Sequence, residues 1–296
     1  LVGSEMCIRD SVDDGGHKAK VGVRNSPDGL ELRIDGESAG GVAALAEALP
    51  LQIIDPDVHE LVAGAPEQRR RYLDWIAFHV EHGFLEAWRR FRRALKQRNA
   101  ALRSGVAGAV LDGWNTEFAE LAVAVDAGRR HALEVALDGL SEAGSDLLGS
   151  EVGFEYRSGW NEEQGLLAAL EGSVERDRQH NNTQYGPHRG DLKLSYDERK
   201  ARKLVSRGQQ KLLACAMVLA AAETAQTARE RPLLLLLDDP GAELDKEALA
   251  RLMQRVAGLG SQVIATSLEP DARLFPGEAR TFHVEHGALQ RATRKP

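Results

Sequence analysis

The sequence contains few cysteines and no long apolar run. Only Cys7 and Cys215 occur among its 296 residues, and neither has a second Cys or a His at metal-ligand spacing. A disulfide framework and a zinc site are therefore not expected, and we expect a protein of the reducing cytoplasm. No apolar stretch reaches the ~18 residues of a membrane span, and no basic segment leads into an apolar one. We expect neither a membrane anchor nor secretion.

The chain also has no excess of basic over acidic residues. The formal net charge is -7 and the isoelectric point is about 5.8, which argues against a protein that coats nucleic acid through its overall charge. Any contact with DNA must be local. The hydrophobic content of 43% allows a substantial core, in one large domain or two smaller ones.

No phosphate-binding loop of the form G-x-x-x-x-G-K-[ST] occurs in the chain. Residues 1–11 show no apolar periodicity, cap or turn that connects them with the residues after them, and they resemble a translated sequencing adapter. We interpret them as an artefact of gene modelling and leave them out of the fold prediction. The natural protein is then expected to begin further upstream, with a phosphate-binding loop in that part.

The pattern of residues 12–64 predicts short strands. Two alternating runs, at residues 20–24 and 30–34, flank Pro27 and Gly29, which suit a hairpin turn. A helix at residues 42–48 and a strand at residues 51–54 complete this part.

Residues 65–149 are almost wholly helical in pattern. Pro66 suits a helix start, Arg70 and Asp74 stand four residues apart, and Leu, Ala and charged residues dominate. We interpret this segment as an inserted α-helical arm, after which the first domain resumes at residue 150.

Residues 150–296 alternate between strand and helix patterns. The expected elements are a strand at 151–156, a helix at 163–178, a strand at 191–196, a helix at 206–229, a strand at 233–237, a helix at 246–256 and a strand at 262–266. Such alternation predicts an α/β fold in which helices cover a parallel sheet.

Five leucines at residues 233–237 run directly into Asp238 and Asp239. The run is typical of a strand buried on both faces, and its acids then stand at the carboxyl end, where open α/β sheets bind ligands. Asp238 suits a ligand of the Mg²⁺ that bridges nucleotide phosphates, and Asp239 suits the orientation of an attacking water. An Asp-Asp turn that only caps a core strand stays open as the alternative.

A second motif opens the long helical pattern that begins after residue 205. It consists of Ser206, Arg207, Gly208, Gln209 and Gln210. Ser206 and Gln209 fit a capping box, which accounts for these two residues structurally. Gly208 is not explained in this way, and a glycine in a first helical turn lets a phosphate approach the backbone N–H groups at the positive end of the helix dipole.

The motifs together resemble a known family. Residues 206–210 resemble the signature motif of ABC-type ATPases, and Asp238 and Asp239 stand where its Walker B acids do. The D-loop that comes after Walker B is matched by Ala242, Glu243, Leu244 and Asp245. With residues 69–74, 78–81, 94–99, 183–189 and 191, the chain resembles the RecF family of DNA repair proteins over nearly its whole length.

That resemblance implies an α/β ABC-type ATPase head, with a mixed sheet and helices, that is related to SMC and Rad50 heads and carries a short inserted helical arm in place of a coiled coil. It implies ATP and Mg²⁺ as cofactors, single-stranded, double-stranded or junction DNA as a partner, an ATP-dependent homodimer, and cooperation with RecR and RecO. The processes are DNA recombination, replication-gap repair and the SOS response to DNA damage. In this superfamily the signature residues reach the nucleotide of the partner subunit.

The chain departs from the superfamily at Thr266, which stands where a switch histidine is expected, and at Asp239, which replaces a glutamate. Both departures lead us to expect slow hydrolysis, suited to a switch. Since the phosphate-binding loop is missing, this chain alone is expected to bind ATP poorly, and only the full-length protein is expected to be a weak ATPase.

Two segments are candidates for DNA contact. Arg89, Arg92, Arg93, Lys96 and Arg103 share one face of a predicted helix, next to an apolar stripe of Trp88, Phe91, Leu95 and Leu102 that we expect in the core. A plain solvated helix surface is the alternative. His188 and Arg189 come after Gly186 and Pro187 in a loop that presents two phosphate-seeking side chains, or that is only a rigid solvated turn.

Two other functions stay open. One is the head of another SMC-like or Rad50-like repair ATPase, although residues 55–186 show no sustained heptads. The other is a non-catalytic DNA-binding or docking module that keeps ABC architecture without nucleotide. Nucleotide-dependent dimerisation of the full-length protein separates the last from an ATPase.

Overall fold

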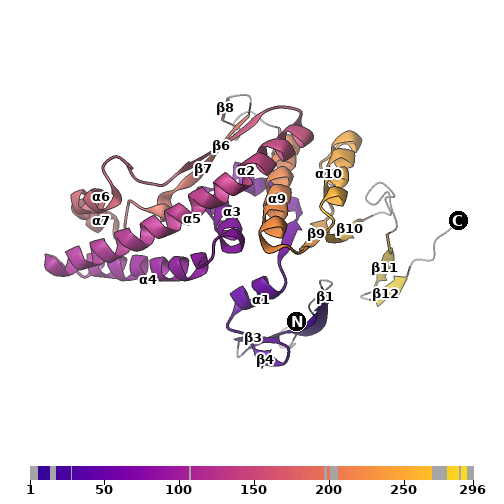
Figure 1. Cartoon of the computed structure of the whole chain (residues 1–296), viewed down its shortest axis with the longest axis horizontal. Helices are drawn as coiled ribbons and strands as arrows, with labels where there is room; N and C mark the ends of the chain where they lie inside the picture. The colour runs from indigo at the N-terminus through magenta and orange to yellow at the C-terminus, as the bar shows by residue number, and fades with distance from the viewer. Residues whose placement is uncertain are drawn as a thin grey trace.

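Helices and several small sheets make up the computed structural model of the chain (Figure 1). The structure describes residues 6–13, 18–27, 29–106, 108–196, 199–200, 206–268, 279–286 and 288–291. Within these residues, a three-stranded parallel sheet and the helix α9 (Arg207–Arg229) form the centre, and two long helices extend from them. No helix in the described part of the chain is long and apolar enough to cross a membrane.

The parallel sheet has the order β10-β9-β5. Its strands are β5 (Leu51–Ile54), β9 (Leu234–Asp238) and β10 (Gln262–Thr266), all predicted from the sequence to within a residue or two at each end. The helix α10 (Lys246–Gly258) lies between β9 and β10 in the chain. The parallel arrangement places the last residues of all three strands at one edge.

The leucine run in β9 is not buried on both faces, so that prediction is wrong. Leu235 and Leu237 are buried, whereas Leu236 is half-buried and pairs with Ile53 on one side and Ile264 on the other. Ile53 and Ile264 are 47% and 52% exposed. An unbroken apolar run indicates that both faces suit burial, but described residues cover only one of them.

The parallel sheet does not include the strand at residues 191–196. This strand, β7 (Asp191–Tyr196), pairs antiparallel with β6 (Val152–Arg157) and with β8 (Arg199–Lys200) in a separate sheet. Strand and helix alternation alone had assigned it to the parallel sheet, and that assignment is wrong. The alternation does not determine which strands pair, since pairing depends on where the intervening chain returns.

An antiparallel sheet of order β1-β2-β3-β4 lies at the start of the chain and is followed by α1 (Val42–Ala48). Its strands are β1 (Met6–Asp13), β2 (Lys18–Ser26), β3 (Gly29–Ile34) and β4 (Glu37–Ser38). The predicted hairpin is confirmed, with Gly29 at φ 129°. Leaving residues 1–11 out of the fold was wrong for those from Met6 onward, because β1 pairs with β2 through its backbone, which requires no apolar periodicity. Their artefactual origin stays a prediction.

The helical arm consists of α3 (Pro66–Val80), α4 (Phe84–Arg103) and α5 (Ala109–Leu148). A short 3-10 turn, η1 (Pro56–His59), and α2 (Glu60–Ala63) lead into it. α4 and α5 pack side by side and reach away from the parallel sheet, as Figure 1 shows. Gly128 of α5 allows this close approach, since a Cβ there would lie 2.6 Å from the Phe84 ring.

Beyond α5, the single helix expected at residues 163–178 is two helices. They are α6 (Leu166–Gly172) and α7 (Val174–His180), and they meet at Ser173, whose hydroxyl donates a hydrogen bond to the Leu170 carbonyl. A side chain that competes for backbone groups in this way ends a helix. The remaining elements are η2 (Pro187–Arg189), β11 (Phe282–Glu285) and β12 (Ala288–Arg291).

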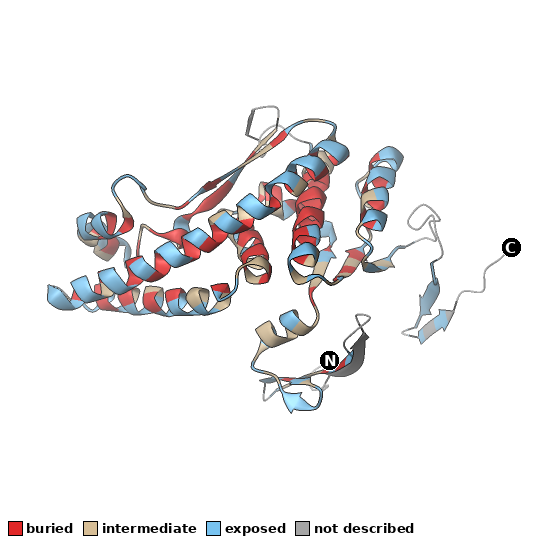
Figure 2. Ribbon diagram, in the orientation of Figure 1, coloured by how far each residue is buried: buried red, intermediate tan, exposed pale blue. Residues whose placement is uncertain are grey.

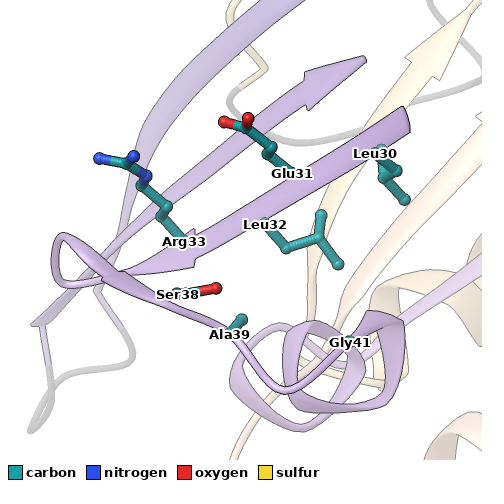
Figure 3. A pocket seen from close by; sticks show the side chains of 7 residues that line it. All are labelled: Leu30, Glu31, Leu32, Arg33, Ser38, Ala39 and Gly41. Atoms are coloured by element: carbon teal, nitrogen blue, oxygen red, sulfur yellow. The ribbon is translucent and has the colours of Figure 1, made fainter. Parts of the chain in front are cut away.

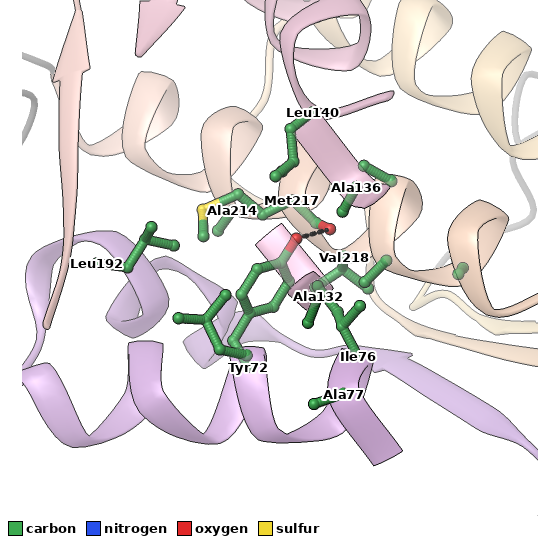
Figure 4. Close-up of a cluster of buried hydrophobic side chains, with 14 of the residues drawn as sticks. Tyr72, Ile76, Ala77, Ala132, Ala136, Leu140, Leu192, Ala214, Met217 and Val218 are labelled. Atoms are coloured by element: carbon green, nitrogen blue, oxygen red, sulfur yellow. Dashed lines mark hydrogen bonds between the residues drawn. The ribbon is translucent and has the colours of Figure 1, made fainter. Parts of the chain in front are cut away.

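The arm and the sheet share one hydrophobic core (Figure 2). α9 lies at its centre, buried along most of its length, and α5 and α3 pack against it. The Tyr72 hydroxyl of α3 donates a 2.9 Å hydrogen bond to the Met217 carbonyl of α9, next to Ala132, Ala136 and Leu140 of α5 (Figure 4). The division of the chain into head and arm stays a prediction, since the core runs through both.

We expect Leu213→Ala to lower the free energy of unfolding by about 2–5 kcal/mol, because this α9 side chain is fully buried and its loss leaves a cavity. Chemical denaturation measures the change. Leu137→Ala on α5, where the side chain is 39% exposed, is the control and should cost less than about 1 kcal/mol. Equal losses would contradict the central place of α9 in the core.

Candidate functional site

The predicted catalytic acids lie at the carboxyl edge of the parallel sheet. Asp238 ends β9 and is exposed, and Asp239 comes directly after it with φ 43°. Thr266, at the end of β10, donates a 2.5 Å hydrogen bond from its hydroxyl to the Asp238 carboxylate and accepts one from the Asp239 backbone N–H at 3.3 Å. The residue at the predicted switch position therefore orients the first acid and the turn after it.

The signature residues open α9. The Ser206 hydroxyl accepts from the Gln209 backbone N–H at 3.3 Å, and the Gln209 side chain accepts from the Ser206 N–H at 2.8 Å, so the predicted capping box is confirmed. This structural account covers Ser206 and Gln209, as the sequence indicated. Arg207, Gly208 and Gln210 extend the first turn.

The signature and the predicted D-loop lie against each other within this one chain. Arg207 forms an ion pair with Glu243 at 3.1 Å, and a Cβ on Gly208 would lie 3.3 Å from the Glu243 carbonyl oxygen. Lys211, whose side chain is buried, donates a 2.7 Å hydrogen bond to the Ala242 carbonyl. The sequence reasoning missed Lys211, because a lysine one helical turn after a cap resembles any solvated helix residue.

The remaining D-loop residues form the start of α10. The Asp245 carboxylate accepts hydrogen bonds from the N–H groups of Glu247 and Ala248 at 3.0 and 2.8 Å, so it caps the helix. Leu244 packs half-buried against the main core. A structural role thus accounts for Asp245 and Leu244.

Two shallow hollows of the described surface lie away from this edge. One shallow pocket of about 380 Å³ is lined by β3 and the segment before α1 (Figure 3). Another, of about 440 Å³, lies between α5, α9 and α10. Among the residues that the structure describes, no group of three or more His, Cys, Asp or Glu side chains is arranged to hold a metal ion. Asp238 as a Mg²⁺ ligand stays a prediction.

The basic face of α4 is exposed as predicted. It consists of Arg89, Arg92, Arg93, Lys96 and Arg103. Next to this face, Phe91 and Leu102 are buried and Trp88 and Leu95 are half-buried, so the stripe is core, as predicted. The face consequently presents cations to solvent along the outer side of the arm (Figure 2).

His188 lies beside two aromatic rings. Its ring lies 6.3 Å from that of Phe91 and 6.1 Å from that of Phe118, and its Nε2 lies 2.9 Å from the Thr183 carbonyl oxygen. Burial lowers the pKa of His188 to about 4, so the imidazole is neutral at physiological pH. These contacts favour a structural role for His188, and its part in DNA or nucleotide binding stays a prediction. Arg189 is exposed and stays a candidate.

Buried ion pairs, which the sequence reasoning missed, hold the loop around His188. Arg129 binds the Asp74 carboxylate and donates a 2.6 Å hydrogen bond to the Pro187 carbonyl, and Arg70 donates one to the Gly190 carbonyl at 2.8 Å. Arg70 and Asp74 stand four residues apart in α3, yet each bonds a different partner. Two further ion pairs, Arg69 with Asp191 and Arg98 with Asp177, are almost completely buried. Only the fold brings these partners together.

The fold and the site define an ABC-type ATPase head of the SMC and RecF kind. The sequence pattern of the family described as RecF/RecN/SMC N terminal domain matches residues 8–283. A solved structure of the recombination mediator protein RecF with an ATP analogue matches with a TM-score of 0.84 at 19% identity, covering 99% of this chain and 82% of that one. An SMC head bound to the C-winged helix domain of ScpA matches with a TM-score of 0.52 at 17% identity, over 97% of this chain and 73% of that one.

Relatives of higher identity specify the family. The DNA replication and repair protein RecF of Thioalkalivibrio sulfidiphilus is 39% identical over 289 residues, which cover 97% of this chain and 80% of the relative. That of Chromohalobacter salexigens is 42% identical over 277 residues, which cover 91% and 77%. The chain belongs to the RecF family of DNA replication and repair proteins.

We expect the free energy of unfolding to fall as the pH is lowered from about 6.5 to about 4. The folded chain keeps His188 neutral to a pKa of about 4, whereas the ordinary value is 6.5, so the unfolded chain binds more protons in this window. Denaturant unfolding at several pH values measures the slope. His188→Gln should make this slope shallower, and His82→Gln, at an exposed position, is the matched control. Equal slopes for wild type and His188→Gln would refute the assignment.

Proposed function

We propose that this protein, in its full-length form, is an ATP-dependent DNA-binding protein of recombinational repair and replication-gap processing. The observation that carries the proposal is an identity of 39–42% to RecF proteins over more than nine-tenths of the chain. RecR and RecO are the proposed protein partners. The solved RecF relatives are described as complexes with ATP or its analogue in the RecFOR pathway, which supports ATP as the nucleotide.

The proposed nucleotide site is composite, formed between two copies of the protein. Asp238 would hold Mg²⁺, and Asp239 would orient the attacking water. Ser206, Gly208 and Gln209 would bind the γ-phosphate held by the partner subunit, through the first turn of a long helix. ATP and Mg²⁺ would supply the phosphoryl group and neutralise the charge that develops on it.

The described residues fit this proposal in three respects. The Asp238 carboxylate is exposed, so an ion can reach it. The capping box leaves the N–H groups of Arg207 and Gly208 without a side-chain acceptor among the bonds described. The Arg207 ion pair with Glu243 and the Lys211 bond to Ala242 link the signature to the D-loop, so movement of one would displace the other.

The proposed DNA surface is the basic face of α4, because the arm is electrostatically one-sided. The exposed face of α5 carries acidic residues, namely Asp112, Glu117, Glu120, Glu134, Asp138, Glu142 and Asp146. A phosphate backbone would be repelled there and attracted to the cations of α4. In a chain of net charge -7, this is the local concentration of positive charge that DNA contact requires.

Reversing the charge of the α4 face should weaken DNA binding. For the triple variant Arg89→Glu/Arg93→Glu/Lys96→Glu we expect the affinity for DNA to fall by about tenfold or more. We also expect a smaller salt slope, the slope of the logarithm of the binding constant against the logarithm of the salt concentration, since each phosphate contact contributes about 0.9 to it. Fluorescence anisotropy with labelled duplex and single-stranded DNA, over a range of salt concentrations, measures both. Arg71→Glu/Arg157→Glu, at exposed arginines outside the face, is the control. An unchanged affinity and slope would remove α4 from the proposal.

A charge at Gly208 should prevent nucleotide-dependent dimerisation. Gly208→Asp adds an anion that the helix dipole tolerates in a first turn but that repels a γ-phosphate. We expect the full-length variant to fold and to remain monomeric with ATP in analytical ultracentrifugation, whereas the near-isosteric Gly208→Asn retains dimerisation in part. If wild type itself showed no response to ATP, the non-catalytic docking module would be the better interpretation.

A further inference from the structure

Arg98 is a fully buried cation in the last third of α4. Its Nη1 donates hydrogen bonds to the Asp177 carboxylate at 2.8 Å and to the Thr183 hydroxyl at 2.7 Å, and its Nε donates to the Asn115 side chain at 2.9 Å. Both side chains of the Arg98 and Asp177 pair are 0% exposed. One side chain thus joins α4, α5, α7 and the loop after α7.

Stability alone is a weak explanation of this pair. Removing two charges from water costs several kcal/mol per ion, and well-packed apolar residues often replace a buried ion pair at no loss of stability. Apolar residues, however, do not form directional hydrogen bonds that could fix the position of the loop. The guanidinium and the carboxylate fix the position of the loop through hydrogen bonds that have one geometry.

The loop is fixed to α4 at further points. The Asn99 side-chain oxygen accepts from the backbone N–H of Thr183 at 2.8 Å and from its hydroxyl at 2.7 Å. The Asp177 carboxylate also accepts from the Gln184 N–H at 3.0 Å. One turn further along α4, Arg103 donates to the Asn181 carbonyl at 3.4 Å.

This docking brings Arg189 to the basic face of α4. The exposed Arg189 guanidinium donates to the Asn182 side chain at 3.0 Å and to the Thr183 carbonyl at 3.4 Å. Thr183 in turn is bound to Asn99, which lies seven residues after Arg92 and four before Arg103, on the same side of the helix. Arg103 binds the Asn181 carbonyl and Arg189 binds the side chain of the next residue, so Arg189 lies beside the end of the face that carries Arg103.

We propose that the loop of residues 181–189 and the outer face of α4 form one surface for a nucleic-acid phosphate backbone, and that Arg98 is the positioning residue that joins them. The occupant is inferred from charge complementarity, because exposed arginines from two segments converge. From Arg89 to Arg103 the helix extends about 21 Å, which matches roughly six base steps of one DNA strand. The inference rests on the proposed function and extends it to a segment about 90 residues away in the chain.

The experiment measures the affinity of the full chain for labelled duplex and single-stranded DNA over a range of salt concentrations. Arg189→Ala should lower affinity several-fold and the salt slope by about one, whereas Arg71→Ala, at an exposed arginine of α3, should change neither. Arg98→Met/Asp177→Asn removes both charges together, keeps a side-chain acceptor for Gln184, and should lower affinity as much as Arg189→Ala does. Adding Arg189→Ala to that variant should cause little further loss, because both changes remove one contact.

A purely structural Arg98 would give another result: Arg98→Met/Asp177→Asn would shift the melting temperature and leave DNA affinity at the wild-type value. That result overturns the inference. Thr183→Val removes only the hydroxyl that bridges Arg98 and Asn99, and it serves as the second variant if the double variant does not fold; an affinity at the wild-type value would then overturn the inference equally.

Two further measurements show whether a negative result contradicts this inference or the proposed DNA surface. If reversal of the α4 charges abolishes binding while Arg189→Ala and the Arg98 variant bind as wild type, the inference fails and the proposed function stands. If α4 reversal itself has no effect, the proposed DNA surface fails. Poly-glutamate serves as a competitor for the same surface. If it displaces DNA at an equal concentration of charge, the surface binds acidic polymers in general, and the assignment to nucleic acid is overturned.

Discussion

Burial of α9 is the constraint on which the rest of the structure depends. This helix is apolar around most of its circumference, and α5, α3, η1, β5 and α10 all pack against it. A helix with apolar residues on every side is stable only when other elements surround it, and each large buried side chain contributes about 1.5–3 kcal/mol. Because its first turn carries the signature residues, the element that organises the core also fixes the proposed nucleotide contact in space.

The charged residues near the parallel sheet and those in the arm differ in their burial. Near the sheet, Asp238 and Arg207 are exposed, and the hydrogen bonds from Thr266 to Asp238 and between Ser206 and Gln209 in the capping box set the local geometry. In the arm, the ion pairs of Arg98 and Arg129 are buried. Buried pairs specify the relative positions of α4, α5 and the loop before β7, and the exposed cations of α4 are thereby held in a row.

The contrast between Asp74 and His188 explains why part of the site escaped sequence reasoning. Asp74 stands four residues after Arg70, a spacing that favours a local pair, yet its carboxylate binds Arg129, 55 residues away. His188 and Arg189 are adjacent and look equivalent in the sequence, but the His188 ring packs beside Phe91 and Phe118, whereas the Arg189 side chain is exposed. The spacing of residues along the sequence indicates which side chains could interact, and the packing of the folded chain decides which of them do.

The sequence by itself determined most of the helices and strands, the order of the motifs and the family resemblance, because hydrophobic periodicity, caps and short motifs are local properties of the chain. Ser206 and Gln209 show this, since three residues of separation suffice for a capping box. Only the tertiary structure decided that β7 pairs with β6, that the described residues cover only one face of β9, and that Arg98 lies inside the arm while its neighbours face solvent. These outcomes depend on contacts between distant segments, whose free energy exceeds any local preference.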